Sequence, residues 1–243
     1  MPHGTPDWGL IGPKETVYGL DDLAEQAVRL GSHHLWDRRG DVILLDSFEN
    51  GLGNWATWCF GLNSLVTLMC GHAAHGAYSV LTRSGVGAGS GWVYLYWYHG
   101  QPRFSRMGLE FAFSMADYMT YWEWEIFWYT GVQRMYARIR WDLASDLLEC
   151  RDSTPAWRTF GTGVCHWNGD FPVHVGKMVA DFAASRYVRF ILNETTYPLV
   201  GIGLDVGPDP SPPYMEVRIS MAASEDEIVS GYVDNVVVTQ NEP

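Results

Sequence analysis

The sequence predicts an all-β fold in which two antiparallel sheets pack against each other, preceded by an extended arm and one short α-helix. Three observations predict this fold. From residue 41 onward, short segments with a period of two are rich in Val, Ile, Tyr, Trp and Phe. Gly, Pro, Asn and Ser separate these segments about every eight to twelve residues, as in β-sandwiches. Finally, 47% of the residues are hydrophobic and 14% are aromatic, which is enough to build a large core.

Residues 1–40 are predicted to contain the arm and the helix. The first 18 or so residues include several prolines and glycines, which exclude a continuous helix or a central strand there. A helix is expected over about residues 20–30, because leucines and alanines recur at three- and four-residue steps and Gly31 follows them. Its apolar stripe either lies across the sheet of the body or docks onto another subunit.

Residues 41–243 are predicted to form a single β-sandwich domain. Its short strands indicate a jelly-roll or concanavalin-like sandwich rather than an alternating α/β fold. The proline-dense segment 207–213 is expected to be a stiff loop. Strands are expected near residues 41–48, 55–60, 64–70, 77–82, 91–99, 107–115, 119–129, 132–142, 156–166, 172–182, 185–192, 213–222 and 229–239.

Acidic residues outnumber basic residues in the chain. There are 28 Asp and Glu against 16 Lys and Arg, so the formal net charge is −12 at pH 7. This sign repels phosphate backbones and anionic headgroups, so neither nucleic acid nor a membrane is an expected partner. No signal peptide is visible, and the longest apolar runs have the length of a strand, far below the roughly 20 residues of a membrane-spanning helix.

Aromatic residues concentrate in two of the predicted strands. In the first strand, alternation places four rings on one face, those of Trp92, Tyr94, Tyr96 and Tyr98. Such a row can stack on sugar rings, but tyrosines also fill sheet interfaces and subunit contacts, so both interpretations stay open. The second strand adds two more candidates for glycan or interface contacts, Trp122 and Trp124.

The second aromatic strand also carries Glu123 and Glu125 on one face. Two neighbouring carboxylates suggest a glycosidase, which needs a proton donor and a nucleophile or base beside the scissile bond. The segment that begins at Glu125 loosely resembles the nucleophile strand of jelly-roll endoglucanases, but no separate second motif completes the pair. Structural pairing with Arg134, Arg138 or Arg140 on the next strand is the favoured interpretation.

The two ends of the body resemble the first and last strands of jelly-roll carbohydrate-binding modules. The resembling segments are 46–55, Asp-Ser-Phe-Glu-Asn-Gly-Leu-Gly-Asn-Trp, and 231–238, Gly-Tyr-Val-Asp-Asn-Val-Val-Val. The resemblance implies that these two strands pair and that a structural calcium ion lies near their junction. Its implied ligands are Asp46, Glu49 and Asp234, and their oxygen atoms are of the kind that calcium prefers.

Two further resemblances concern the fold and the organisation of the chain. Residues 174–193 resemble the hairpin of laminin-G and concanavalin-like sandwiches, in which a turn joins two long strands. The arm, the helix and segment 29–43 together resemble virion structural proteins of tailed bacteriophages, which decorate capsids or form fibres. This resemblance implies a virion location and assembly in the host cytoplasm, for which no signal peptide is needed.

These observations favour a non-enzymatic structural protein of a large assembly, namely a virion capsid-decoration or fibre component. The expected partners are further copies of the chain and neighbouring subunits such as a major capsid protein. The sequence contains no nucleophile elbow, P-loop or dinucleotide fingerprint, so the enzyme classes that depend on these motifs have no support. The alternative is a carbohydrate-binding β-sandwich module, with a jelly-roll glycoside hydrolase as its enzymatic variant.

Overall fold

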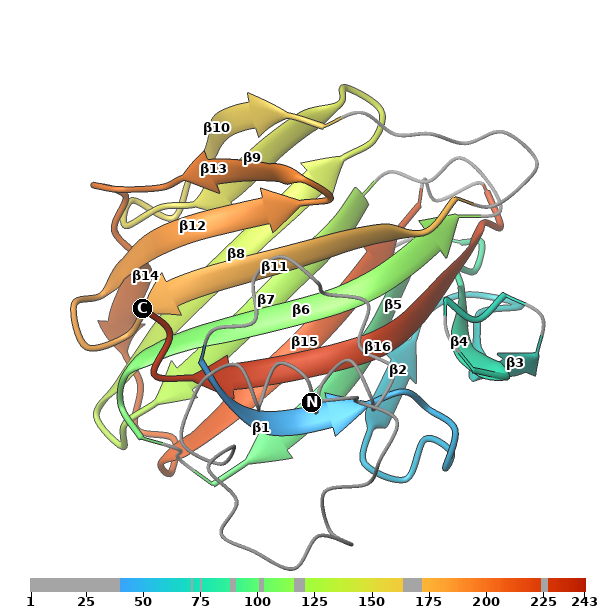
Figure 1. Cartoon of the computed structure of the whole chain (residues 1–243), viewed down its shortest axis with the longest axis horizontal. Helices are drawn as coiled ribbons and strands as arrows, with labels where there is room; N and C mark the ends of the chain where they lie inside the picture. The colour runs from blue at the N-terminus through green and yellow to red at the C-terminus, as the bar shows by residue number, and fades with distance from the viewer. Residues whose placement is uncertain are drawn as a thin grey trace, which may run out of the picture.

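The computed structural model describes residues 40–70, 72–74, 76–87, 91–100, 103–115, 121–163, 172–223 and 227–243. Within these ranges every regular element is a β-strand, and the strands form two antiparallel sheets that pack face to face (Figure 1). The predicted two-sheet antiparallel sandwich is therefore confirmed. The predicted arm and the helix over about residues 20–30 lie outside the described residues. The described part of the chain has no helix long and apolar enough to cross a membrane.

Sheet A brings together strands from both ends of the described chain. Its strand β1 (Asp41–Asp46) pairs with the last strand, so that Leu45 lies opposite Val237. The first and last strands therefore pair, as the resemblance to carbohydrate-binding modules implied, but of the segment 46–55 only Asp46 belongs to β1, opposite Val236. In spatial order the other strands are β13 (Thr195–Pro198), β12 (Arg186–Leu192), β11 (His174–Asp181), β6 (Arg106–Met115), β16 (Ser230–Gln240), β4 (Tyr78–Arg83) and β3 (Leu65–Cys70).

Sheet B lies behind sheet A in Figure 1 and holds the two aromatic strands. Its strand β14 (Asp205–Pro208) pairs with β8 outside the main order. The other strands, in spatial order, are β10 (Trp157–Thr162), β9 (Leu147–Arg151), β8 (Gln133–Asp142), β7 (Tyr121–Tyr129), β15 (Tyr214–Ala222), β5 (Trp92–His99) and β2 (Ala56–Cys59).

Three short strands are absent from the sequence prediction, namely β9, β13 and β14. The prediction of a loop over 207–213 is wrong at its start, because Gly207 and Pro208 belong to β14 and lie opposite Arg134 and Gln133. A proline fits there because it has no N–H to donate, and β14 pairs with β8 alone.

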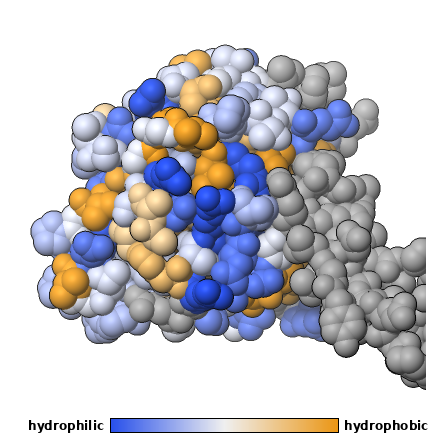
Figure 2. All heavy atoms as spheres, turned by 60° about the vertical axis from the view of Figure 1, so that its left-hand side comes forward, coloured by the Kyte–Doolittle hydropathy of each residue, from blue (hydrophilic) through white to orange (hydrophobic). Residues whose placement is uncertain are grey.

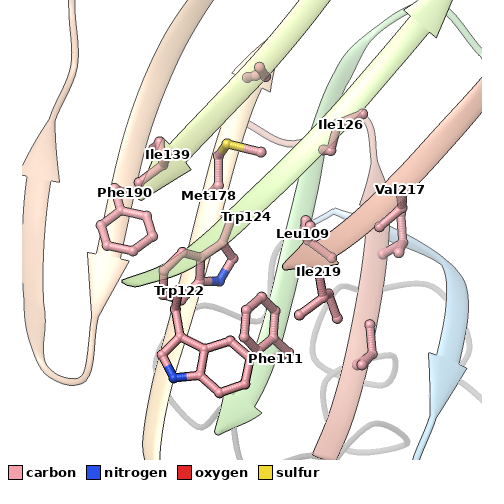
Figure 3. Packing of buried hydrophobic residues seen from close by; sticks show 14 of the residues in the cluster. Leu109, Phe111, Trp122, Trp124, Ile126, Ile139, Met178, Phe190, Val217 and Ile219 are labelled. Atoms are coloured by element: carbon pink, nitrogen blue, oxygen red, sulfur yellow. The ribbon is translucent and has the colours of Figure 1, made fainter. Parts of the chain in front are cut away.

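The core lies between the sheets and contains the inward-facing tryptophans of β7. The side chain of Trp124 is fully buried, and its ring lies 4.8 Å from that of Phe111 and 4.9 Å from that of Phe190 (Figure 3). The indole Nε1 of Trp124 donates a hydrogen bond of 3.1 Å to the carbonyl of Gly176. A side chain at residue 176 would collide with this indole, so glycine allows β11 to approach the ring.

Strict alternation along β7 divides its side chains between two environments. Trp122, Trp124 and Ile126 face the core, whereas Glu123 and Glu125 face away from it. The outward side of β7 and of its neighbours in sheet B therefore forms a surface distinct from the core. On the side of the sandwich where β10, β13 and β14 lie, Figure 2 shows polar and apolar residues interspersed.

Candidate functional site

The outward-facing side of sheet B, called the open face from here on, gathers aromatic and charged side chains from several strands. The strand register places them side by side, because β15 lies between β5 and β7. Arg218 on β15 is opposite Tyr96 on one side and Glu125 on the other. Glu125 in turn is opposite Arg138 on β8. Residues distant in the sequence thus form one row across the sheet.

An aromatic row follows β5 across the open face. The rings of Trp92 and Tyr94 lie 5.5 Å apart at an interplanar angle of 5°, and those of Tyr96 and Tyr98 lie 6.2 Å apart at 4°. Trp58 on β2 stacks against Tyr94 at 5.8 Å. Trp58 and Tyr98 are 51% and 55% exposed, whereas Tyr96 is buried. The most accessible of these rings are therefore Trp58 and Tyr98.

Arg218 covers the middle of the aromatic row. Its guanidinium carbon lies 5.4 Å from the ring centre of Tyr94, 4.8 Å from that of Tyr96 and 4.5 Å from that of Phe127. A guanidinium over an aromatic ring is stabilised by the negative face of the ring. Arg218 also forms an ion pair with Glu216, with Nη2 2.6 Å from Oε1. Rings and carboxylate together fix the position of this arginine.

Arg138 holds the two carboxylates of β7. Its Nη2 lies 2.7 Å from Oε2 of Glu123, and its Nε lies 3.0 Å from Oε2 of Glu125. The sequence prediction that these glutamates pair with arginines of the next strand is confirmed for Arg138. Arg140 pairs instead with Glu149 at 2.7 Å, and its guanidinium carbon lies 4.1 Å from the ring centre of Trp157.

Glu123 is the most strongly perturbed carboxyl group of this cluster. Burial, followed by the negative charge of Glu125, raises its pKa to about 7 against the opposing effect of Arg138 and Arg140. Among the described residues, Oε1 of Glu123 has no hydrogen-bond partner. Glu125 differs because Ser220 donates a hydrogen bond to its Oε1. The pair therefore contains one carboxyl group that titrates near neutral pH beside a hydrogen-bonded one.

The structure divides the predicted aromatic candidates into two groups. The row Trp92, Tyr94, Tyr96 and Tyr98 lies on the open face, as alternation predicted. Trp122 and Trp124 do not, because both are fully buried in the core and available to neither a glycan nor a partner subunit. Both faces of β7 carry aromatic residues, but the two glutamates lie on the face opposite the tryptophans, which favours the tryptophan face as the buried one.

Two tryptophans of the open face were not among the predicted site residues, namely Trp58 and Trp157, and neither was Arg218. Each tryptophan was included in a predicted strand, at 55–60 and 156–166. Their position beside the aromatic row and the arginines depends on which strands pair, and no local pattern encodes that pairing. The available signal was a tryptophan in a short predicted strand, next to Thr57 in one case and to Arg158 in the other.

The predicted calcium ligands do not form one cluster. Asp46 accepts hydrogen bonds from the backbone N–H of Phe48 at 2.9 Å and from the indole of Trp55 at 3.0 Å. Glu49 accepts one from the N–H of Ala77 at 2.8 Å, and Asp234 one from the N–H of Ala74 at 2.9 Å. Within the described ranges no three His, Cys, Asp or Glu side chains are placed to hold a metal ion. Calcium binding stays a prediction, which melting curves with and without EDTA test.

Comparison with known proteins identifies relatives in fold only. No protein-family model and no curated protein sequence matches the chain. An endo-β-1,4-glucuronan lyase from the fungus Trichoderma reesei matches with a TM-score of 0.54 and 10% identity over 82% of this chain and 96% of the lyase. A carbohydrate esterase from the Shiga toxin-encoding bacteriophage phi24B matches with a TM-score of 0.51 and 13% identity over 84% of this chain and 100% of the esterase. At these identities the likeness establishes a shared β-sandwich fold.

These similarities correct the prediction that the chain is not an enzyme. Both of the proteins described above are enzymes named for carbohydrates, so the predicted fold gives no ground for excluding catalysis. The predicted role in a virion, and the contacts with further copies or with capsid subunits, depended largely on residues 1–40. Of these only residue 40 is described, so that role stays a prediction.

Proposed function

We propose that the chain binds a polysaccharide along the open face of sheet B. The observation that carries the proposal is a pair of exposed rings, Trp58 beside Tyr94 and Tyr98 at one end of the aromatic row, with Arg218 over Tyr94 and Tyr96. Trp58 is opposite Tyr94, and Tyr98 lies four positions further along β5 than Tyr94. The two rings are therefore about 13 Å apart along the strand direction. This span exceeds one sugar ring and suits an oligosaccharide or polymer.

The charges at the centre of the face favour a glycan over a partner subunit. Asp and Glu are depleted from the centres of protein interfaces, where desolvation is complete, whereas Arg and aromatic residues are enriched there. The centre of the open face instead holds the carboxylate of Glu125, in ion pairs with Arg138 and Arg218. Aromatic rings beside hydrogen-bonding groups match a sugar, which has apolar C–H faces and a rim of hydroxyl groups. That both enzymes sharing the fold are named for carbohydrates supports the same conclusion.

Affinity electrophoresis in native gels that contain soluble polysaccharides tests the proposal. Trp58→Ala and Tyr98→Ala should each weaken binding about tenfold, because an aromatic contact contributes about 1–1.5 kcal/mol. Tyr78→Ala is the matched control, because Tyr78 is a 41% exposed aromatic residue on β4 of sheet A. The proposal would be contradicted if none of the polysaccharides retarded the wild type. It would also be contradicted if the wild type and both variants were retarded equally.

The same face supports a second candidate function, cleavage of the bound glycan. The observation that favours it is Glu123, whose pKa is raised to about 7 mainly by burial and whose Oε1 has no hydrogen-bond partner among the described residues. Carboxyl groups with pKa values near the working pH suit general acid catalysis. Glu123 is only 1% exposed, so a substrate would have to displace a covering side chain. For this reason binding is the function that the geometry supports best.

Release of new chain ends from a bound polysaccharide tests the second candidate. Glu123→Gln should abolish the release and leave binding intact, since the amide keeps the shape but cannot transfer a proton. Activity that depends on protonated Glu123 should decline as the pH rises through about 7, the value to which burial raises its pKa. Polysaccharide that is bound without cleavage by the wild type would reject this candidate and retain the first.

A further inference from the structure

The arginines of the open face are already matched by carboxylates. The structure describes five close pairs there: Arg134 with Asp209 at 3.7 Å, Arg138 with Glu123 at 2.7 Å, Arg140 with Glu149 at 2.7 Å, Arg151 with Asp205 at 3.2 Å and Arg218 with Glu216 at 2.6 Å. Glu125 adds a further carboxylate beside Arg138 and Arg218. The described part of the face therefore has no excess of positive charge.

This balance opposes an anionic ligand. A carboxylate or sulfate of a charged polysaccharide would have to compete with a protein carboxylate for each guanidinium. Several of these protein carboxylates are buried, and loss of an arginine would leave a charge uncompensated in a poorly hydrated site. The net charge of −12 adds a long-range repulsion that acts before contact. The row of arginines is therefore not a site for capturing anions.

Hydrogen bonding by these arginines remains available. A guanidinium has five N–H donors, and Arg218 directs Nε and Nη2 to the same oxygen, Oε1 of Glu216. Its side chain is still 24% exposed, and that of Arg138 is 20% exposed. Uncharged hydroxyl oxygens can accept from the remaining N–H groups without displacing a carboxylate. The exposed rings of Trp58 and Tyr98 supply the apolar contacts.

We infer that the ligand of the open face is an uncharged polysaccharide. This inference rests on the proposed function and specifies its ligand class. Hydroxyethylcellulose and carboxymethylcellulose form a matched pair of probes, because they share a backbone and differ in charge. Arabinoxylan and galactomannan extend the neutral set, and alginate and polygalacturonate extend the anionic set. Gels containing each polymer are to be run at low and at high salt.

We expect the dissociation constants obtained from the retardation to be at least tenfold lower for the neutral polymers than for the anionic ones. The constants for the neutral polymers should depend little on salt. Stronger retardation by carboxymethylcellulose, alginate or polygalacturonate would overturn the inference and leave polysaccharide binding standing. Retardation by no polymer of either set would overturn the proposed function itself, and with it the inference. The two failures are thus distinguished in one experiment.

One substitution tests the charge balance directly. Glu149→Gln removes the carboxylate that contacts both Nε and Nη2 of Arg140. The variant should gain at least fivefold affinity for carboxymethylcellulose at low salt, and high salt should remove the gain. Glu194→Gln is the matched control, because it makes the same change of net charge at an exposed residue between β12 and β13. An equal gain in both variants, or a gain in neither, would contradict the inference.

Discussion

Each sheet carries a cluster of carboxylates and cations on its outer side, and the two clusters differ in how far their cations reach solvent. On sheet A, Glu242 binds Lys177 at 2.8 Å and Arg189 at 2.7 Å, and these cations are only 1% and 10% exposed. On sheet B, Arg138 and Arg218 also bind buried carboxylates but remain 20% and 24% exposed. Ion pairs whose cations are shielded from solvent, called sealed from here on, can only stabilise the fold. Cations in contact with solvent are also available to a ligand.

The last residues of the chain complete the cluster on sheet A. Arg189 donates a hydrogen bond of 3.0 Å from Nη1 to the carbonyl of Pro243, and Thr239 donates one of 2.6 Å to Oε1 of Glu242. A Cβ atom at residue 108 would lie 2.9 Å from the same oxygen, so Gly108 leaves room for the glutamate. On sheet B, by contrast, Oε1 of Glu123 lacks a hydrogen-bond partner among the described residues. The carboxylate of Glu242 on sheet A therefore has its partners within the chain, whereas Glu123 on sheet B keeps one oxygen atom that a ligand could contact.

The largest expected effect is the loss of stability when the sealed cluster is broken. Glu242→Ala leaves Lys177 and Arg189 without their shared carboxylate in a buried site. Removal of one partner from a buried ion pair costs about 3–5 kcal/mol, because an uncompensated charge remains. The free energy of unfolding should decrease by that amount in urea denaturation monitored by tryptophan fluorescence.

Glu194→Ala provides the control for this measurement. Glu194 is exposed, so its removal should change the free energy of unfolding by less than about 0.5 kcal/mol. A loss below about 1 kcal/mol in Glu242→Ala would show that the sheet A cluster is not sealed in solution, and the contrast with sheet B would disappear.

A smaller effect is expected from the open cluster when the pH is varied. Burial and the charge of Glu125 raise the pKa of Glu123 to about 7 in the folded protein, from an ordinary value of 4.5. The folded state therefore binds more protons than the unfolded chain between these two values. The free energy of unfolding should fall through this window as the pH rises, by on the order of 2–3 kcal/mol, and the contribution should be constant above it.

Comparison of wild type with Glu123→Gln isolates this contribution. Urea denaturation at pH 5 and pH 8 should show a smaller loss of stability on raising the pH in the variant than in the wild type. Titrating groups that do not interact with Glu123 contribute equally to both proteins and cancel in the difference, which therefore reports Glu123 together with its interaction with Glu125. Identical pH dependence in the two proteins would mean that Glu123 titrates as an ordinary exposed glutamate.

The open face also shows which features could be predicted from the sequence and which could not. Alternation within one strand is a local pattern, so it correctly placed Glu123 and Glu125 on one face and the row from Trp92 to Tyr98 on one face. The contact of Arg218 with that row depends on β15 lying between β5 and β7, which no local pattern encodes. The short strands β9, β13 and β14 have too few residues for a period to be visible.

The burial of Trp124 corrects a second prediction made from the sequence. The predicted alternation of β7 was right, but both faces of the strand carry large aromatic side chains. The two glutamates on the other face favoured the tryptophan face as the core, so the assignment of Trp122 and Trp124 to a binding surface was wrong despite a signal in the sequence. The deciding observation is the packing of Trp124 against Phe111 and Phe190, which come from β6 and β12 of the opposite sheet.

The smallest effect is expected for the ion pair between Arg218 and Glu216. A double-mutant cycle with Arg218→Met and Glu216→Gln should give a coupling energy of about 1 kcal/mol or less, because the guanidinium is partly exposed, and salt should reduce it. The same cycle with Arg189→Met and Glu242→Gln should give up to about 3 kcal/mol, with little effect of salt, because both side chains are buried. Equal coupling energies with the same salt dependence would mean that solvent exposure does not distinguish the two clusters. The difference between a structural ion pair on sheet A and a ligand-facing one on sheet B would then be lost.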